Sequence, residues 1–160
     1  MMNRRTRPAA LAAIVFLAMA EPVDAQIGFG GDVVRAADAF GGTTGVGARI
    51  RLGVPLFPVS AALNGDWFFP DCPNTDCSLR GATLDVNYSF PIPLLHPWVG
   101  VGWSIRRIEI GGATSTERGL NVGVGAELEL TKLRPFVDLR YEMAEAPERQ
   151  YVARIGLMFN

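Results

Sequence analysis

The sequence predicts an all-β protein, an eight-stranded antiparallel up-and-down transmembrane β-barrel. From residue 27 onwards, apolar side chains alternate with polar or small ones in eight segments of about ten residues, which is the period of a strand with one apolar face. Short proline-marked connections alternate with longer polar ones, as in a barrel with turns on one side of a membrane and loops on the other. We expect the last strand, 150–160, to pair with the first, because an open apolar edge promotes aggregation.

The chain has 160 residues and a net charge of -1, so it fits one domain and gives no reason to expect nucleic acid as a partner. Residues 1–25 are predicted to be a signal peptide, because Arg4, Arg5 and Arg7 precede an apolar run at 9–20 that is too short to span a bilayer. Cleavage is expected after Ala25, with Ala20 as the alternative. The barrel domain is then 26–160.

The remaining elements follow from the alternation. The predicted strands are 27–34, 45–54, 59–67, 81–90, 98–106, 120–130, 136–143 and 150–160. The short turns are 55–58, 91–97 and 131–134, and the expected outer loops are 36–44, 68–80, 108–118 and 144–150. Pro58, Pro97 and Pro135 are expected to open the third, fifth and seventh strands, where proline costs no ladder hydrogen bond. The alternation shifts at Arg106-Arg107, which predicts a bulge there or an exit from the apolar layer.

Charged residues inside the predicted strands lie on the face opposite the apolar one. They form a predicted interior charge network of Asp32, Arg49, Arg51, Asp66, Asp85, Arg106, Glu127, Glu129, Asp138, Arg140, Glu142 and Arg154. A soluble barrel would sort its residues identically, so this face does not by itself decide between lipid and water. Glycines on the polar face, cations that are all arginine, and aromatic residues near strand ends favour a narrow charged interior and a lipid-facing exterior.

These features together resemble a known family. The signal segment, the eight alternating strands, the stretch 97–102 that opens a strand and the aromatic residue ending the last strand are similar to the small eight-stranded outer-membrane β-barrel superfamily. That superfamily includes the transmembrane domain of outer membrane protein A, outer membrane protein X and the opacity-type proteins. Asn160, which follows the last aromatic residue, departs from the pattern.

The resemblance implies the setting of the protein. We expect a monomer in the outer membrane of a Gram-negative-type bacterium, surrounded by outer-membrane lipid, with both mature termini periplasmic. It also implies recognition of the last strand by the barrel-assembly machinery, through an assembly signal at Tyr151, Ile155, Leu157 and Phe159.

The chemistry of the chain points away from catalysis. Cys72 and Cys77 lie in one polar loop of an exported chain and are predicted to form a disulfide. His96 is the one histidine and sits in a short turn without a neighbouring Ser or Asp, so no catalytic residue, cofactor or metal is predicted.

Two functions from different classes remain. The first is a non-enzymatic membrane barrel with a plugged charged interior, displaying its outer loops for envelope integrity, adhesion or partner binding. The second is a soluble secreted lipocalin-like barrel that carries an apolar ligand. A porin-like path for ions or protons through the interior charges is a further alternative to the plug. The direction in which Val122, Val124 and Leu128 face separates the membrane barrel from the soluble carrier.

Overall fold

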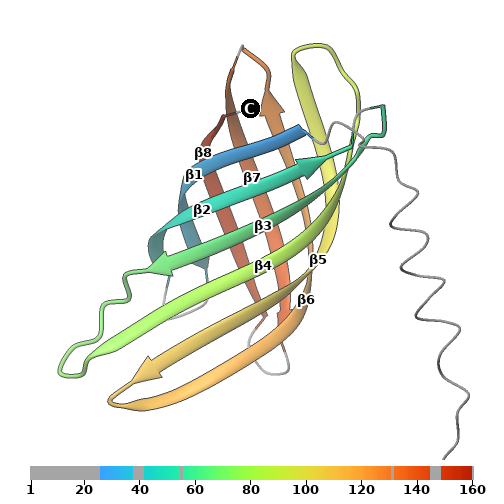
Figure 1. Cartoon of the computed structure of the whole chain (residues 1–160). Helices are drawn as coiled ribbons and strands as arrows, with labels where there is room; N and C mark the ends of the chain where they lie inside the picture. Colours follow the sequence, from blue (N-terminus) through green and yellow to red (C-terminus); the bar gives the residue numbers. More distant parts are fainter. Residues whose placement is uncertain (1–25, 38–41, 55, 131, 145–148, 160) are drawn as a thin grey trace, which may run out of the picture.

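The computed structural model describes residues 26–37, 42–54, 56–130, 132–144 and 149–159, and the predicted signal peptide lies outside them. Within these ranges, eight strands form one closed barrel in which every strand pairs antiparallel with its neighbours in sequence (Figure 1). The strands are β1 (Gln26–Ala37), β2 (Thr43–Gly53), β3 (Val59–Phe68), β4 (Cys77–Ser89), β5 (Leu95–Ile110), β6 (Ala113–Leu128), β7 (Leu133–Ala144) and β8 (Arg149–Phe159). The predicted fold class is confirmed.

The barrel closes between β1 and β8. Their register runs from Phe29 opposite Phe159 to Ala37 opposite Tyr151, so neither strand is left with a free edge along this stretch. Both ends of the described barrel lie on the side of the short turns, at the top of Figure 1. No described helix is long and apolar enough to cross a bilayer.

The strands β5 and β6 correct the predicted loop at 108–118. Each contains 16 residues, and they pair without interruption until Ile110 lies opposite Ala113. Gly111 and Gly112 make the turn between them, with φ angles of 56° and 84° that suit glycine. This hairpin and the one between β3 and β4 project from the barrel at the loop end, at the lower left of Figure 1. β4 likewise begins at Cys77, inside the predicted loop 68–80.

Of the two alternatives predicted at Arg106-Arg107, the bulge is wrong, and the strand leaves the apolar layer there instead. Arg106 lies opposite Gly81 on one side and Glu117 on the other, and Arg107 lies opposite Arg80 and Thr116, so both ladders keep their register. The alternation shifts because Ile108 points inward and packs against a small apolar cluster. The polarity of the two faces changes at this level of the barrel, while the strand itself continues.

That apolar cluster lies at the loop end of the interior. Its buried members are Val34, Ala36, Phe68, Leu79 and Val152. Five positions follow one row of the ladder: Val34 lies opposite Gly45, Gly45 opposite Phe68, Phe68 opposite Leu79 and Leu79 opposite Ile108. The cluster therefore fills the loop end of the barrel from several strands at once.

Pro97 and Pro135 are the third residues of β5 and β7, not the first as predicted. Each lies where its strand is paired on one side alone: Pro97 is opposite Ala126, and Pro135 is opposite Leu157. Pairing with the other neighbour starts one residue later, at Trp98 and Phe136. The proline nitrogens are tolerated for that reason.

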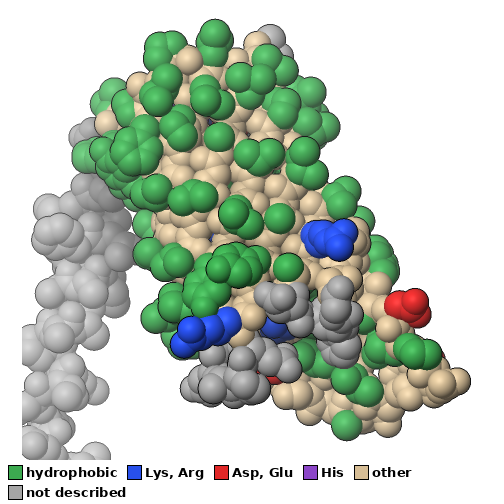
Figure 2. All heavy atoms as spheres, turned by 180° about the vertical axis from the view of Figure 1, so that it is seen from behind, with side chains coloured by type: hydrophobic (Ala, Val, Ile, Leu, Met, Phe, Trp, Pro, Cys, Tyr) green, Lys and Arg blue, Asp and Glu red, His purple; other side chains and the backbone are tan. Residues whose placement is uncertain are grey.

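Hydrophobic side chains cover the outer wall of the barrel. Figure 2 shows this for the face that points away from the viewer in Figure 1. Leu120 is 55% exposed, Val124 is 52% exposed and Ile155 is 63% exposed. Arg49 and Glu127, by contrast, are 5% and 4% exposed. The barrel thus has the polarity opposite to that of a water-soluble protein, with its charges inside and its large apolar side chains outside.

Candidate functional site: the charged interior

Most of the predicted network lies buried in the barrel. The buried members are Asp32, Arg49, Asp66, Asp85, Arg106, Glu127, Asp138, Arg140, Glu142 and Arg154. Arg51 is partly exposed, and Glu129 lies beyond the end of β6 with 42% of its side chain exposed, so it belongs to the rim at the turn end.

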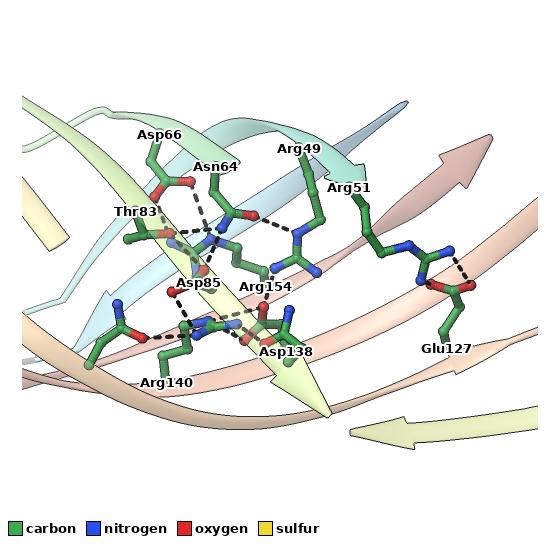
Figure 3. A network of polar contacts seen from close by, with 12 residues as sticks. Arg49, Arg51, Asn64, Asp66, Thr83, Asp85, Glu127, Asp138, Arg140 and Arg154 are labelled. Atoms are coloured by element: carbon green, nitrogen blue, oxygen red, sulfur yellow. Dashed lines mark hydrogen bonds and ion pairs between the residues drawn. The ribbon is translucent and has the colours of Figure 1, made fainter. Parts of the chain in front are cut away.

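Arg140 of β7 occupies the centre of the network (Figure 3). Its guanidinium lies 2.8 Å from Asp85 on β4 and 3.2 Å from Asp138 on its own strand. It also donates hydrogen bonds to Asn121 at 2.8 Å and to Asn87 at 3.1 Å. One fully buried cation thus joins residues of β4, β6 and β7 across the interior.

Arg49 of β2 forms a second connection across the barrel. Its guanidinium pairs with Asp138 of β7 and donates a hydrogen bond to Asn64 of β3. The same guanidinium lies 4.3 Å from the ring centroid of Phe136 and 5.9 Å from that of Trp98. An aromatic face is a favourable neighbour for a cation away from water, so these two inward rings help to hold the charge.

Arg154 of β8 donates two hydrogen bonds to the carboxylate of Asp66 on β3, from Nη2 at 2.7 Å and from Nε at 3.3 Å. Between this pair and Asp85, neutral groups continue the network: Asn64 donates to Thr83 at 2.7 Å and to Asp85 at 2.8 Å. Carboxylates that accept several hydrogen bonds can stay charged inside a protein, and arginine forks match them geometrically.

Two further groups lie towards the ends. Towards the loop end, Arg106 pairs with Glu142, which also accepts a hydrogen bond from Gln150 at 2.8 Å. Towards the turn end, Glu127 binds Arg51 and Arg134, and Glu129 lies 2.8 Å from Arg134 and 3.0 Å from His96. These contacts extend the chain of ion pairs along the interior of the barrel.

Glycine makes room for the network. A Cβ atom at Gly102 of β5 would lie 2.5 Å from the carbonyl oxygen of Leu84 and closer still to the carboxylate of Asp85. Any side chain at this position would have to displace backbone, so the narrow interior admits the charged side chains because positions such as this one carry none.

Sequence reasoning missed the neutral and aromatic members of the interior. These are Asn64, Thr83, Asn87, Trp98, Asn121, Phe136 and Gln150. Their signal was available, because each lies an even number of residues from a predicted charged member of the same strand. A search limited to charged side chains passes over the groups that satisfy those charges.

The remaining predicted sites lie elsewhere. The predicted disulfide between Cys72 and Cys77 is confirmed, with Cα atoms 6.2 Å apart in the loop between β3 and β4. Tyr151, Ile155, Leu157 and Phe159 are exposed on the outward face of β8. Among the described residues, no group of three His, Cys, Asp or Glu side chains is placed to hold a metal ion.

Comparisons with known proteins are consistent with this architecture. No protein-family model matches the sequence, and no curated protein matches it. Among solved structures, neisserial surface protein A is 18% identical, with a TM-score of 0.58 over 82% of this chain and 92% of that one. The N-terminal β-barrel domain of Pseudomonas aeruginosa OprF is 17% identical, with a TM-score of 0.61 over 84% of this chain and 98% of that one.

A major outer membrane protein from Thermus thermophilus is 15% identical, with a TM-score of 0.54 over 84% of this chain and 99% of that one. These similarities are in fold. The chain has the fold of the small eight-stranded outer-membrane β-barrels.

Proposed function

We propose that this chain is an integral, non-enzymatic outer-membrane protein whose barrel is closed to ions and displays its outer loops to the surroundings. The observation that carries the proposal is the reversed polarity of the barrel. Val124 and Leu120 are exposed on the wall, whereas Arg49 and Arg140 are buried inside. An apolar wall of this extent favours lipid over water, and a closed barrel leaves no strand edge in the hydrocarbon.

The interior supports the closed state. An eight-stranded barrel is just wide enough to be filled by its own side chains. The central Arg140 is fully buried between Asp85 and Asp138, and the apolar cluster around Phe68 and Leu79 lies between this network and the loop end. An ion entering from either end would have to displace paired charges or cross an apolar layer.

The soluble carrier requires the opposite arrangement. A lipocalin-like barrel holds its apolar ligand against apolar side chains inside, but the middle of this interior is lined by Asp85, Asp138 and Arg140. Its apolar side chains are on the wall, where a soluble protein would meet water. The geometry therefore favours the membrane protein.

Two experiments test this proposal. The protein should fractionate with outer membranes, require detergent for extraction, and run faster on gels before heating than after, because a closed barrel resists the detergent at room temperature. Recovery in the soluble fraction with a bound apolar ligand would establish the carrier instead.

The second experiment measures conductance. In planar bilayers the protein should conduct no ions. Stable conductance that Arg49→Ala or Glu127→Ala alters would establish an ion path; we expect these variants to lose stability without conducting.

The orientation is part of the proposal. We place the loop end, with its disulfide hairpin and the long β5–β6 hairpin, at the cell surface, and the turn end with both barrel termini in the periplasm. Thr114→Cys at the loop end and Lys132→Cys at the turn end form a matched pair of exposed positions. A membrane-impermeant maleimide applied to whole cells should label the first variant, and labelling of the second alone would reverse the orientation.

In this setting the barrel acts as a rigid support. Strands at least ten residues long hold the loop-end hairpins in fixed positions, which suits adhesion, envelope integrity or binding of a partner by the loops. Assembly by the barrel-assembly machinery, with Phe159 and its outward neighbours on β8 as the signal, completes the proposal.

A further inference from the structure

Three arginines lie close together on the outer wall at the loop end. On the outward face, Arg80 of β4 lies directly opposite Arg107 of β5, and Trp67 of β3 lies opposite Arg80 on the other side. On β6, Arg118 lies opposite Ile105 and is two residues from Thr116, the partner of Arg107. All three arginines are exposed. We call Arg80, Arg107 and Arg118 the arginine triad.

The triad has an excess of positive charge. Side chains directly opposite each other on neighbouring strands have Cβ atoms about 5 Å apart, and like charges in such pairs are destabilising. Arg107 is paired with Glu109 at 2.8 Å, and Glu109 also accepts a hydrogen bond from Ser78 at 3.2 Å. Within the described ranges, Arg80 and Arg118 have no acidic partner. Three guanidinium groups therefore share one carboxylate.

The position of the triad relates this charge to a membrane. Immediately towards the turn end, the same outward face carries Ile105, Trp103 and Leu84, all exposed apolar residues. Trp67 flanks the triad and is 53% exposed, as expected of an aromatic residue at a membrane interface. The arginines thus lie at the border of the apolar wall, at the level where lipid headgroups meet the hydrocarbon.

Other exposed cations are distributed in the same way. Arg35 on β1 and Arg149 on β8 are exposed towards the loop end, and Figure 2 shows cationic side chains along the lower border of the hydrophobic wall. Of the exposed lysines and arginines in the described ranges, Lys132 is the one at the turn end. The positive charge on the wall is therefore concentrated at one of its two borders.

We propose that the arginine triad binds the phosphate of a lipid headgroup, while Trp103, Ile105 and Leu84 contact the acyl chains of the same lipid. Guanidinium forks bind phosphate oxygens in pairs, and a phosphate would relieve the repulsion between Arg80 and Arg107. A free phosphate ion would use the arginines and leave the apolar contacts unused, so we assign the site to a lipid. The inference rests on the proposed membrane location.

The test uses tryptophan fluorescence, because Trp67 and Trp103 are exposed beside the site whereas Trp98 is buried inside. The full barrel is inserted into phosphatidylcholine vesicles that contain a minor fraction of phosphatidic acid with brominated acyl chains. Quenching should exceed the level expected for random mixing of the lipids. A cation near an anionic membrane surface changes lipid binding by about fivefold, so Arg80→Gln should lower the preference for phosphatidic acid by about that factor.

Matched variants separate phosphate recognition from general charge. The triple variant Arg80→Gln, Arg107→Gln, Arg118→Gln should quench at the random-mixing level, and Lys132→Gln should behave as the unaltered protein. Arg80→Lys should retain part of the preference, because it keeps the charge without the fork. Heat-dependent gel mobility shows that each variant is folded.

Several outcomes would overturn the site. Random-mixing quenching in the unaltered protein, or an unchanged preference in the triple variant, would exclude it. Inorganic phosphate can be added at a concentration similar to that of the phosphatidic acid. If it abolishes the preference for phosphatidic acid, the site binds the free ion and the lipid assignment is wrong. Failure of the proposed membrane location looks different and is recognised with control vesicles of brominated phosphatidylcholine, which would then quench neither tryptophan.

Discussion

Arg140 and Asp85 form an ion pair at 2.8 Å between β7 and β4, strands that are not neighbours in the barrel, and neither side chain has any exposed surface. The pair spans the interior, and Arg140 also donates hydrogen bonds to the amides of Asn87 on β4 and Asn121 on β6. Such a contact depends on the closed barrel, because an open sheet would not bring β4 and β7 together. The same is true of Arg49 with Asp138 and of Arg154 with Asp66.

Removal of the central cation should therefore be costly. Breaking a buried ion pair from one side leaves an uncompensated charge, and Arg140→Met should lower the free energy of unfolding by about 3–5 kcal/mol. Urea unfolding in lipid vesicles measures this change. The double variant Arg140→Met, Asp85→Asn should lose less, since it removes one of the stranded charges. A loss for Arg140→Met as small as that for the exposed Lys132→Met would contradict the central role of the pair.

A cation introduced on the outer wall tests whether this apolar surface faces lipid. Val124→Arg should lower the free energy of unfolding in vesicles by about 2–4 kcal/mol if the position lies near the bilayer midplane. Leu128→Arg, which is four residues nearer the turn end on the same face, should cost less. Val124→Ala controls for the lost side chain. Equal and negligible costs for both arginine variants would show that this wall does not face lipid.

The interior glycines give a prediction based on space. Gly102→Ala forces a methyl group against Leu84 backbone and the Asp85 carboxylate, and overpacking of this kind costs about 1–3 kcal/mol. Gly65→Ala is the matched control, because a Cβ atom there has no other described atom within 4 Å. Urea unfolding should separate the two variants. Similar stabilities would mean that the interior can expand to accept side chains.

The disulfide constrains one hairpin at the loop end. Cys72 and Cys77 close a six-residue segment, so reduction should lower the free energy of unfolding by about 2 kcal/mol through the greater freedom of the unfolded chain. Cys72→Ser should show the same unfolding curve as the reduced protein, with no further effect of reductant. A larger loss would indicate that the hairpin supports the barrel itself.

The sequence predicted the barrel because a side chain on the outer wall and one in the narrow interior differ in polarity at every second position. This contrast lies behind all eight strands and the inward direction of Arg49 and Arg140. The contrast in polarity weakens beyond the apolar outer wall, at the loop end, where Ile108 points inward and Arg107 points outward. The predictions for the ends of β4, β5 and β6 failed there for that reason. Of the two alternatives predicted at Arg106-Arg107, the bulge was wrong, whereas the exit from the apolar layer occurs along a regular strand.

The contacts inside the barrel were less accessible to sequence reasoning. Alternation shows which residues face inward but carries no information about distance along the axis of the barrel. The pairing of Arg154 with Asp66, and the place of Glu129 at the rim, depend on how far each strand is shifted against the next. That shift accumulates around the barrel and is fixed when β8 meets β1.

The pairing of β1 with β8 also has a consequence for the time course of folding. Arg49 and Asp138 are 89 positions apart, and Asp66 and Arg154 are 88 apart, so the decisive contacts form late and their loop closure is entropically costly. Until then β1 and β8 each have an unpaired edge, and the outer face of the sheet exposes its apolar side chains. We expect the unfolded chain to need a chaperone that covers these surfaces until β8 pairs with β1 and closes the barrel.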